Sequence, residues 1–157
     1  MKRLGLKKCA VVAVCACALL ACERIVYSDC RSLPDDWDKD SVLAFPFAID
    51  DVDGLYQTQL IVRNTDNYKN QNLWLFVEQS TPNGTTTRDT VQYFLADEFG
   101  RWLGSGIGSI HENVCIYQPR VRYRTAGIYT LRVAHGMRYN NLDGISELGV
   151  KIVKLEQ

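Results

Sequence analysis

The sequence predicts an all-β protein, a single β-sandwich domain that follows a short N-terminal leader. Apolar and polar residues alternate in short segments along residues 37–157, and turn signals separate these segments roughly every 8–15 residues. The residues after position 22 lack the apolar period of an amphipathic helix. Such a run of short strands favours two packed antiparallel sheets, and immunoglobulin-like and jelly-roll topologies both fit the pattern.

Residues 1–21 have the composition of a lipoprotein signal peptide. Residues 2–8 contain four basic side chains, and residues 9–20 are uncharged and apolar or small. This run is shorter than the roughly 20 residues that cross a bilayer, and it fits the core of a secretory signal. Residues 19–22, Leu-Leu-Ala-Cys, look like a bacterial lipobox, which predicts cleavage before Cys22 and attachment of palmitate-type acyl chains to its thiol. Two or more chains would hold the mature protein stably on a membrane.

Removal of this leader determines the length and charge of the working chain. Taking 21 residues from 157 leaves 136, enough for one domain with a real core. The leader holds four of the 18 basic side chains and none of the 18 acidic ones, so the mature net charge is −4. Nucleic acid needs a clustered basic face, so we expect no nucleic-acid partner. No acidic run follows Cys22, which favours an outer-membrane position facing the periplasm.

The first half of the mature chain begins with an expected tether. Residues 22–36 are interpreted as a lipidated tether that ends in a Pro-Asp-Asp turn, with the β-sandwich domain at 37–157. Residues 42–49 alternate as a strand, and Pro46 lacks a backbone donor, so this strand is expected at a sheet edge or a bulge. A turn at 50–54 then leads into a second alternating strand at 55–63.

The remaining strands follow from apolar runs and turn residues. Residues 72–78, Asn-Leu-Trp-Leu-Phe-Val-Glu, predict a central strand buried on both faces. A Thr-Pro-Asn-Gly hairpin signal returns the chain, and a glycine-rich connection follows the next strand. The expected later strands are residues 85–96, 113–117, 121–124, 127–137 and 145–153.

The residue types needed for catalysis or metal binding are sparse. His111 and His135 are too few for a histidine-based zinc site. The Gly-Ser-Gly at 104–106 does not form the G-x-S-x-G elbow, and pairing of Cys115 with a distant histidine is weak support for a nucleophile. The aspartates at 50–53 lack EF-hand spacing and favour a solvated turn. We therefore expect a non-enzymatic protein with no metal and no cofactor.

Two cysteines remain beside the lipidated one in the mature chain. Cys30 and Cys115 form an even pair in an oxidising compartment, where a disulfide is allowed. The alternative is that both are small buried hydrophobic residues. Sequence alone does not give the distance between them.

Aromatic and arginine residues supply the candidate binding features. Trp102 stands in the glycine-flanked connection, either as an exposed platform for a partner or a sugar, or as a plug over the end of the sandwich. Tryptophan and arginine are favoured interface anchors, and loops on rigid scaffolds commonly carry function. The expected partner surface therefore comprises Arg101, Trp102, Gly104 and Gly106. In the alternative, a glycan- or peptidoglycan-binding module, Trp37 and Trp102 would stack on sugars, whereas Trp74 is expected in the core.

An arginine strip is the last candidate feature. Arg120, Arg122 and Arg124 alternate and so share one strand face. With Arg132 and Arg138 they form either a solvated face or a basic strip that would meet an acidic partner.

Several segments between residues 72 and 149 resemble the sequence patterns of a known family. Residues 89–106, Asp-Thr-Val through Leu-Ala-Asp to Trp-Leu-Gly-Ser-Gly, resemble the D-T-I-x-x-x-L-A-D-x-x-G-x-W-L-G-x-G segment of the GldH-type gliding-motility lipoproteins. Residues 72–76 are similar to the N-L-W-L-F strand of that family. Its G-x-Y, M-R and L-x-G-I-x-x-x-G patterns resemble Gly127 to Tyr129, Met137-Arg138 and residues 142–149.

This resemblance implies a process and a place. It implies a cell-envelope lipoprotein that is an accessory of the gliding-motility machinery and of the linked protein-secretion apparatus. Expected partners are envelope motility or secretion proteins. The resemblance implies no catalytic residues.

Overall fold

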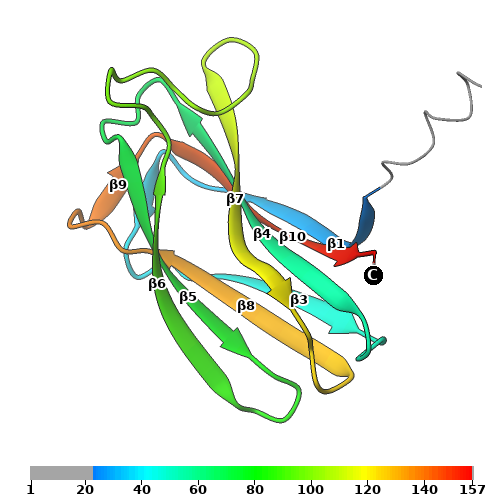
Figure 1. The fold of residues 1–157 in the computed structure, drawn as a ribbon. Coiled ribbons are helices and arrows are strands. Elements are labelled where there is room, and N and C mark those ends of the chain that lie inside the picture. The colour runs from blue at the N-terminus through cyan, green and yellow to red at the C-terminus, as the bar shows by residue number, and fades with distance from the viewer. Residues whose placement is uncertain (1–22, 157) are drawn as a thin grey trace, which may run out of the picture.

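The structure, a computed structural model, describes residues 23–156 and is built from strands (Figure 1). The predicted all-β sandwich is confirmed. Within residues 23–156 there is no helix long and apolar enough to cross a membrane. Cys22 and the expected signal peptide lie outside the described residues. The strands are β1 (Arg24–Ser32), β2 (Asp36–Asp38), β3 (Leu43–Ile49), β4 (Leu55–Thr65), β5 (Asn72–Ser80), β6 (Thr86–Phe94), β7 (Ile110–Val121), β8 (Gly127–His135), β9 (Asn141–Asp143) and β10 (Ile145–Leu155).

The strand pairs are nested, and this nesting identifies a jelly roll. Antiparallel pairs join β1 with β10, β2 with β9, β3 with β8, β4 with β7, and β5 with β6. The chain thus forms one long hairpin that turns between β5 and β6. The hairpin is rolled so that β10 also pairs with β4 and β8 with β5. The result is two four-stranded sheets, β1-β10-β4-β7 and β3-β8-β5-β6, and a short two-stranded sheet, β2-β9. The jelly-roll alternative is the one adopted.

The core lies between the inner faces of the two sheets. On β3, Phe45, Phe47 and Ile49 are buried, as alternation along the strand requires. The Phe47 ring stacks on Tyr129 with centroids 5.8 Å apart. Pro46 points to an edge strand, and β3 is the outermost strand of its sheet, which confirms that prediction. The same core contains side chains of the other sheet, including Leu60, Val62, Leu148, Val150 and Ile152.

The burial of two tryptophans differs from what the sequence indicated. Trp37, which the glycan-binding alternative would use to stack on sugars, is fully buried and donates its indole N–H to the carbonyl oxygen of Ser41 at 3.1 Å. Trp74, expected in the core, is 38% exposed, because β5 buries only one face. Leu73, Leu75 and Val77 face the core, whereas Trp74 and Phe76 lie on the outer face. The strand is an inner strand of its sheet, and the other sheet covers one of its faces while the outer face stays open, so the predicted burial on both faces is wrong.

Two segments differ from the sequence interpretation. Residues 24–32 of the expected tether form β1, which pairs with β10 along its length. Residues 113–117 and 121–124 were expected as two strands separated at Pro119, but β7 continues through Pro119. The strand tolerates proline there because it is an edge strand, and its register with β4 shifts near Thr58.

The sandwich has two distinct ends. The start of β1, the end of β10 and the β3–β4, β5–β6 and β7–β8 connections share one end, here called the anchor end (Figure 1). The connections β1–β2, β4–β5, β6–β7 and β8–β9 share the opposite end, here called the far end. The expected partner loop therefore lies at the far end, away from the start of the domain.

Candidate functional site: a surface between β6 and β7

The β6–β7 connection, residues 95–109, folds back on the sheets. The backbone N–H of Leu103 donates to the carbonyl oxygen of Leu95 at 2.9 Å. Ser105 and Glu112 exchange two backbone hydrogen bonds of 3.0 and 2.7 Å. These bonds make the connection an extension of both sheets and fix which of its side chains point outward.

Gly104 and Gly106, both predicted for the partner surface, allow the connection to pack closely against β7. A Cβ on Gly106 would lie 1.9 Å from the carbonyl oxygen of Ile110, and one on Gly104 would lie 2.8 Å from that of Glu112. Both distances are shorter than real Cβ contacts, so only glycine fits without a backbone shift. Gly104 and Gly106 are therefore needed to position the loop.

A short turn holds Arg101. The Asp97 carboxylate accepts hydrogen bonds from the backbone N–H groups of Arg101 and Phe99, each at 2.9 Å. The guanidinium of Arg101 also donates to Asp97 at 2.7 Å and lies 5.3 Å from the centre of the Phe99 ring. The backbone bond from Arg101, helped by its guanidinium, holds the pKa of Asp97 below its ordinary value. Arg101 remains exposed at the surface.

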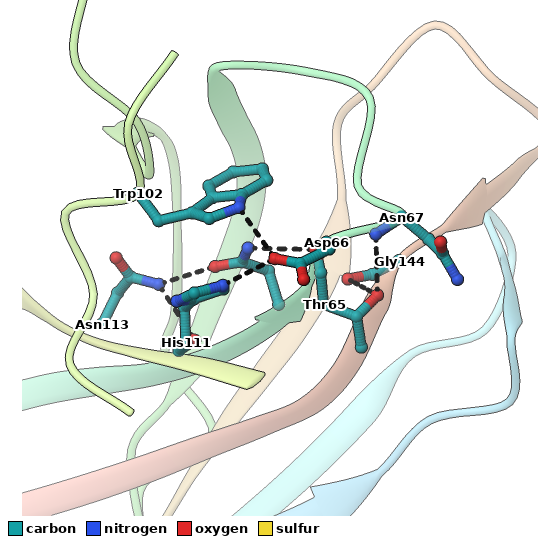
Figure 2. Close-up of polar contacts among 8 residues, drawn as sticks. Thr65, Asp66, Asn67, Trp102, His111, Asn113 and Gly144 are labelled. Atoms are coloured by element: carbon teal, nitrogen blue, oxygen red, sulfur yellow. Dashed lines mark hydrogen bonds and ion pairs between the residues drawn. The ribbon is translucent and has the colours of Figure 1, made fainter. Parts of the chain in front are cut away.

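Trp102 is clamped between loops (Figure 2). Its indole N–H donates to Oδ1 of Asp66 at 3.2 Å, and Nε2 of His111 lies 2.8 Å from the same oxygen. The indole stacks on the His111 ring with centroids 5.5 Å apart, and Tyr68 packs nearby. The side chain is partly buried. Of the two alternatives, the geometry matches the plug, because Trp102 ties the β4–β5 loop and β7 to its own loop.

The exposed apolar side chains lie beside this clamp. Phe94 and Leu103 are each 59% exposed, and Val114 of β7 is 55% exposed. Together with Ile116 they line a groove of about 450 Å³ that also touches Ser105 and Glu112. We call Phe94, Leu103, Val114 and Ile116 the β6–β7 apolar surface. It combines residues of β6, of β7 and of the connection between them, and β6 and β7 are each the outermost strand of one of the two sheets.

Sequence reasoning located this region but missed most of its surface residues. Of the predicted residues, Gly104 lines the groove, and Arg101 and Trp102 precede it in the chain without lining it. Leu103, between Trp102 and Gly104, is the exposed apolar side chain of this segment. Val114 and Ile116 alternate with the buried Cys115, so alternation did signal one outward face. The sequence did not say which face, because both carry apolar residues.

A second apolar groove lies on the outer face of the β3-β8-β5-β6 sheet. Phe76, Ala134 and Val42 line it, and its volume is about 650 Å³. At its rim the Arg88 guanidinium lies 2.6 Å from the Glu78 carboxylate. Trp74 is on the same face of β5, two residues before Phe76.

The two cysteines are not brought together. Both thiols are free; Cys30 is exposed on β1 and Cys115 is buried on β7. Three strand spacings separate β1 from β7, about 14 Å, and a disulfide needs Cα atoms within about 7 Å. Cys30 also lies on the outer face, over Gly149, whereas Cys115 faces the core. This fold does not accommodate the Cys30–Cys115 disulfide that the sequence allowed.

Cys115 and His135, two of the residues considered for catalysis, are both buried. Burial raises the pKa of Cys115 to about 12, which keeps the thiol protonated at neutral pH. Burial lowers the pKa of His135, and its Nε2 lies 3.1 Å from the carbonyl oxygen of Trp37. A carbonyl accepts only, so Nε2 carries the proton. No group of three or more His, Cys, Asp or Glu side chains within residues 23–156 is arranged to hold a metal ion.

Comparison with solved structures gives weak similarities. The Eiger TNF of S. frugiperda aligns at 11% identity and a TM-score of 0.36, covering 66% of this chain and 60% of that one. The infectious bursal disease virus Gx strain structure aligns at 15% identity and a TM-score of 0.40, covering 87% and 30%. TM-scores this low support no inference about this chain.

Sequence comparison gives a clear relationship. A "gliding motility lipoprotein GldH homolog" of Christiangramia forsetii is 31% identical over 136 residues, which cover 82% of this chain and 83% of the relative. The "gliding motility lipoprotein GldH" of Flavobacterium johnsoniae is 28% identical over 155 residues, covering 94% and 96%. The model of the GldH lipoprotein family matches residues 25–152, nearly the whole described structure. The chain belongs to the GldH lipoprotein family.

Proposed function

We propose that this protein is a lipid-anchored accessory of the gliding-motility machinery that acts by binding another envelope protein and catalyses no reaction. Its family membership and the names of its relatives support the motility role. The lipobox before Cys22 supports acylation at that residue. The partner is a component of the motility machinery or of its linked secretion apparatus.

The observation that carries the binding proposal is the β6–β7 apolar surface. Single exposed hydrophobic residues are ordinary on protein surfaces, but contiguous apolar patches mark interaction sites. Phe94, Leu103, Val114 and Ile116 share one groove, and the clamp at Trp102 and the close packing at Gly106 fix the position of the connection that carries Leu103. A preorganised surface loses little conformational entropy on binding.

The position of this surface favours an extended partner segment. The strands β6 and β7 are each the outermost strand of a sheet, and edge strands are templates for pairing with another chain. A partner strand could add backbone hydrogen bonds while its side chains fill the apolar groove. The exposed Arg101 at the neighbouring turn would contribute at the rim.

We place the anchored protein in the outer membrane, facing the periplasm. The absence of an acidic run after Cys22 in the sequence supports this position. The proposed partner surface is at the far end of the domain, where periplasmic segments of envelope proteins can reach it.

The test is crosslinking and affinity capture from intact envelopes, with the native lipoprotein carrying a C-terminal tag. The variant pair is Leu103→Ser with Val114→Ser, and the control is Ile128→Ser, whose side chain is 57% exposed at the start of β8, at the other end of the sandwich and outside this groove. We expect wild type and the control to capture identified motility or secretion components, and the Leu103/Val114 variant to lose them. Equal capture by all three contradicts the proposed surface.

The alternative glycan-binding function now depends on different residues. Trp37 is buried and Trp102 is clamped, but Trp74 and Phe76 are exposed aromatics beside the groove of about 650 Å³. Retention of the purified protein on peptidoglycan, lost on Phe76→Ala, would support this alternative. A protein adaptor is expected to show no retention.

A further inference from the structure

The chain enters the domain almost directly from the proposed lipid anchor. β1 begins at Arg24, two residues after Cys22, and two extended residues span at most about 7 Å. β1 is paired with β10 from Arg24 onward, so no flexible linker intervenes in the described part of the chain. With lipid on Cys22, the start of β1 therefore lies within about one Debye length, roughly 8 Å at physiological salt, of the membrane surface.

Exposed apolar side chains gather at this same end. Ile25 and Val26 at the start of β1 are 52% and 41% exposed, and Val52 in the β3–β4 turn is also exposed. A groove of about 410 Å³ joins Arg24 to Asp51, Asp53 and Lys154, so the start of β1 and the β3–β4 turn are neighbours. Apolar side chains beside acyl chains are placed to enter the interfacial region of a bilayer.

The two ends of the sandwich also differ in charge. The far-end segments 33–42, 66–71, 95–109 and 136–144 contain eight acidic and four basic residues. The anchor-end segments 23–24, 50–54, 81–85, 119–126 and 154–156 contain five of each. An anionic surface repels the far end and tolerates the anchor end.

The basic residues at the anchor end are concentrated in one connection. Residues 119–126 contain Arg120, Arg122 and Arg124 and no acidic residue, and all three arginines are exposed. Arg122 donates to the backbone carbonyl of Asp53 at 2.6 Å, which ties this connection to the β3–β4 turn. Across the end face, Lys154 pairs with Asp51 at 2.5 Å, so that carboxylate is already neutralised.

We infer that the anchor end rests on an anionic phospholipid surface, with Val26 and Val52 at the lipid interface and Arg120 and Arg124 against headgroup phosphates. The inference rests on the proposed acylation of Cys22. In this orientation the long axis of the sandwich stands away from the bilayer. The acidic far end and the β6–β7 apolar surface then face the aqueous side, where a protein partner can reach them.

The test measures which end of the acylated protein lies near lipid. A Cys30→Ser background leaves the buried Cys115 as the other described thiol, and a single fluorescent label is placed at Val52→Cys or at Ile107→Cys, which is 97% exposed at the far end. The protein is reconstituted in vesicles of phosphatidylethanolamine and phosphatidylglycerol that carry a headgroup quencher. We expect quenching at position 52 to be at least twice that at position 107.

A matched pair of charge reversals tests the arginine contact. Arg120→Glu with Arg124→Glu should reduce quenching at position 52 by half or more. Lys69→Glu with Arg138→Glu at the far end changes the net charge equally and should leave it unaltered. Thermal unfolding of each variant verifies that the domain is intact. Equal quenching at the two label positions, or equal effects of the two reversals, overturns the inference.

Flotation separates this inference from the anchoring proposal. A protein that floats with vesicles but shows no difference between the labels retains its anchor and loses the proposed orientation. A protein that does not float, with Cys22 unmodified by mass spectrometry, contradicts the acylation and with it the orientation.

Discussion

Replacing Trp102 by alanine should destabilise the domain far more than replacing its exposed neighbour Leu103. Burying a tryptophan removes roughly 150–250 Å² from water. The lower value suits a partly buried ring, and about 25 cal/mol per Å² gives ~4 kcal/mol as an upper estimate. The open edge of the ring and partial collapse of the site reduce the expected loss to about 2–3 kcal/mol. Asp66 loses one donor, but water can replace it because that carboxylate is 59% exposed.

The assay is unfolding of the purified mature domain by heat and by denaturant, followed by far-ultraviolet circular dichroism. For a domain of this size, 2–3 kcal/mol lowers Tm by roughly 6–15 °C. Leu103→Ala should stay within about 0.5 kcal/mol of wild type, as expected for a side chain at the surface. Trp102→Phe keeps most ring contacts and should lose only about 1 kcal/mol.

If Trp102→Ala unfolds like the wild type, the proposed structural role of Trp102 is refuted. The reasoning is also refuted if Leu103→Ala lowers stability as much as Trp102→Ala, because the two neighbours would then not have opposite orientations. A stable Trp102→Ala that loses partner capture would restore the exposed-platform interpretation.

Three further predictions follow from single contacts. Gly106→Ala should lower the free energy of unfolding by at least about 2 kcal/mol, because the added Cβ would meet the Ile110 carbonyl oxygen. Gly84→Ala has open space around it and should lower that free energy by only roughly 1 kcal/mol, the cost of a left-handed backbone for alanine. Equal urea midpoints of the two variants would contradict this. Burial lowers the pKa of His135 in the folded protein, so as the pH falls below about 6.5 this histidine is protonated in the unfolded chain before it is protonated in the folded one. The free energy of unfolding should therefore decrease below about pH 6.5, by at most about 1.4 kcal/mol per pH unit. His135→Gln should flatten this part of the stability profile, and an unchanged slope would exclude His135 as the cause. In the acylated protein, whose Cys22 thiol is blocked by lipid, a maleimide should modify Cys30 in the native state and both Cys30 and Cys115 after unfolding in denaturant without reductant. If neither thiol reacts until a reductant is added, the two form a disulfide.

The candidate surface was only partly predictable from sequence. The segment 101–106 was identified because tryptophan, arginine and glycine cluster there, and the structure places it beside the apolar groove. The roles within it could not be read, because side chains alternate. Trp102 turns into the clamp with Asp66 and His111, whereas Leu103 turns outward. Asp66 is 36 residues away in sequence from Trp102, so only folding brings them together.

The sequence by itself determined the fold class, most of the strands and the family. Alternation is a local property of a strand, so β3, β4, β8 and β10 were recognisable from their own residues. A missing backbone donor is also local, which is why Pro46 indicated an edge strand correctly. The motif order along residues 72–149 was sufficient to indicate the family.

The tertiary structure decided what depends on distant neighbours. The sequence indicated only a short β-like piece at residues 24–27 within the expected tether, whereas the strand runs over residues 24–32 because β10 offers an edge to pair with. Trp37 is buried and Trp74 exposed because burial depends on the layer opposite, not on the residue type. The choice of a jelly roll, the separation of Cys30 from Cys115, and the position of β6 and β7 as edge strands of different sheets all follow from how the long hairpin rolls up. These are long-range contacts, and the energy that selects among them comes from the whole core.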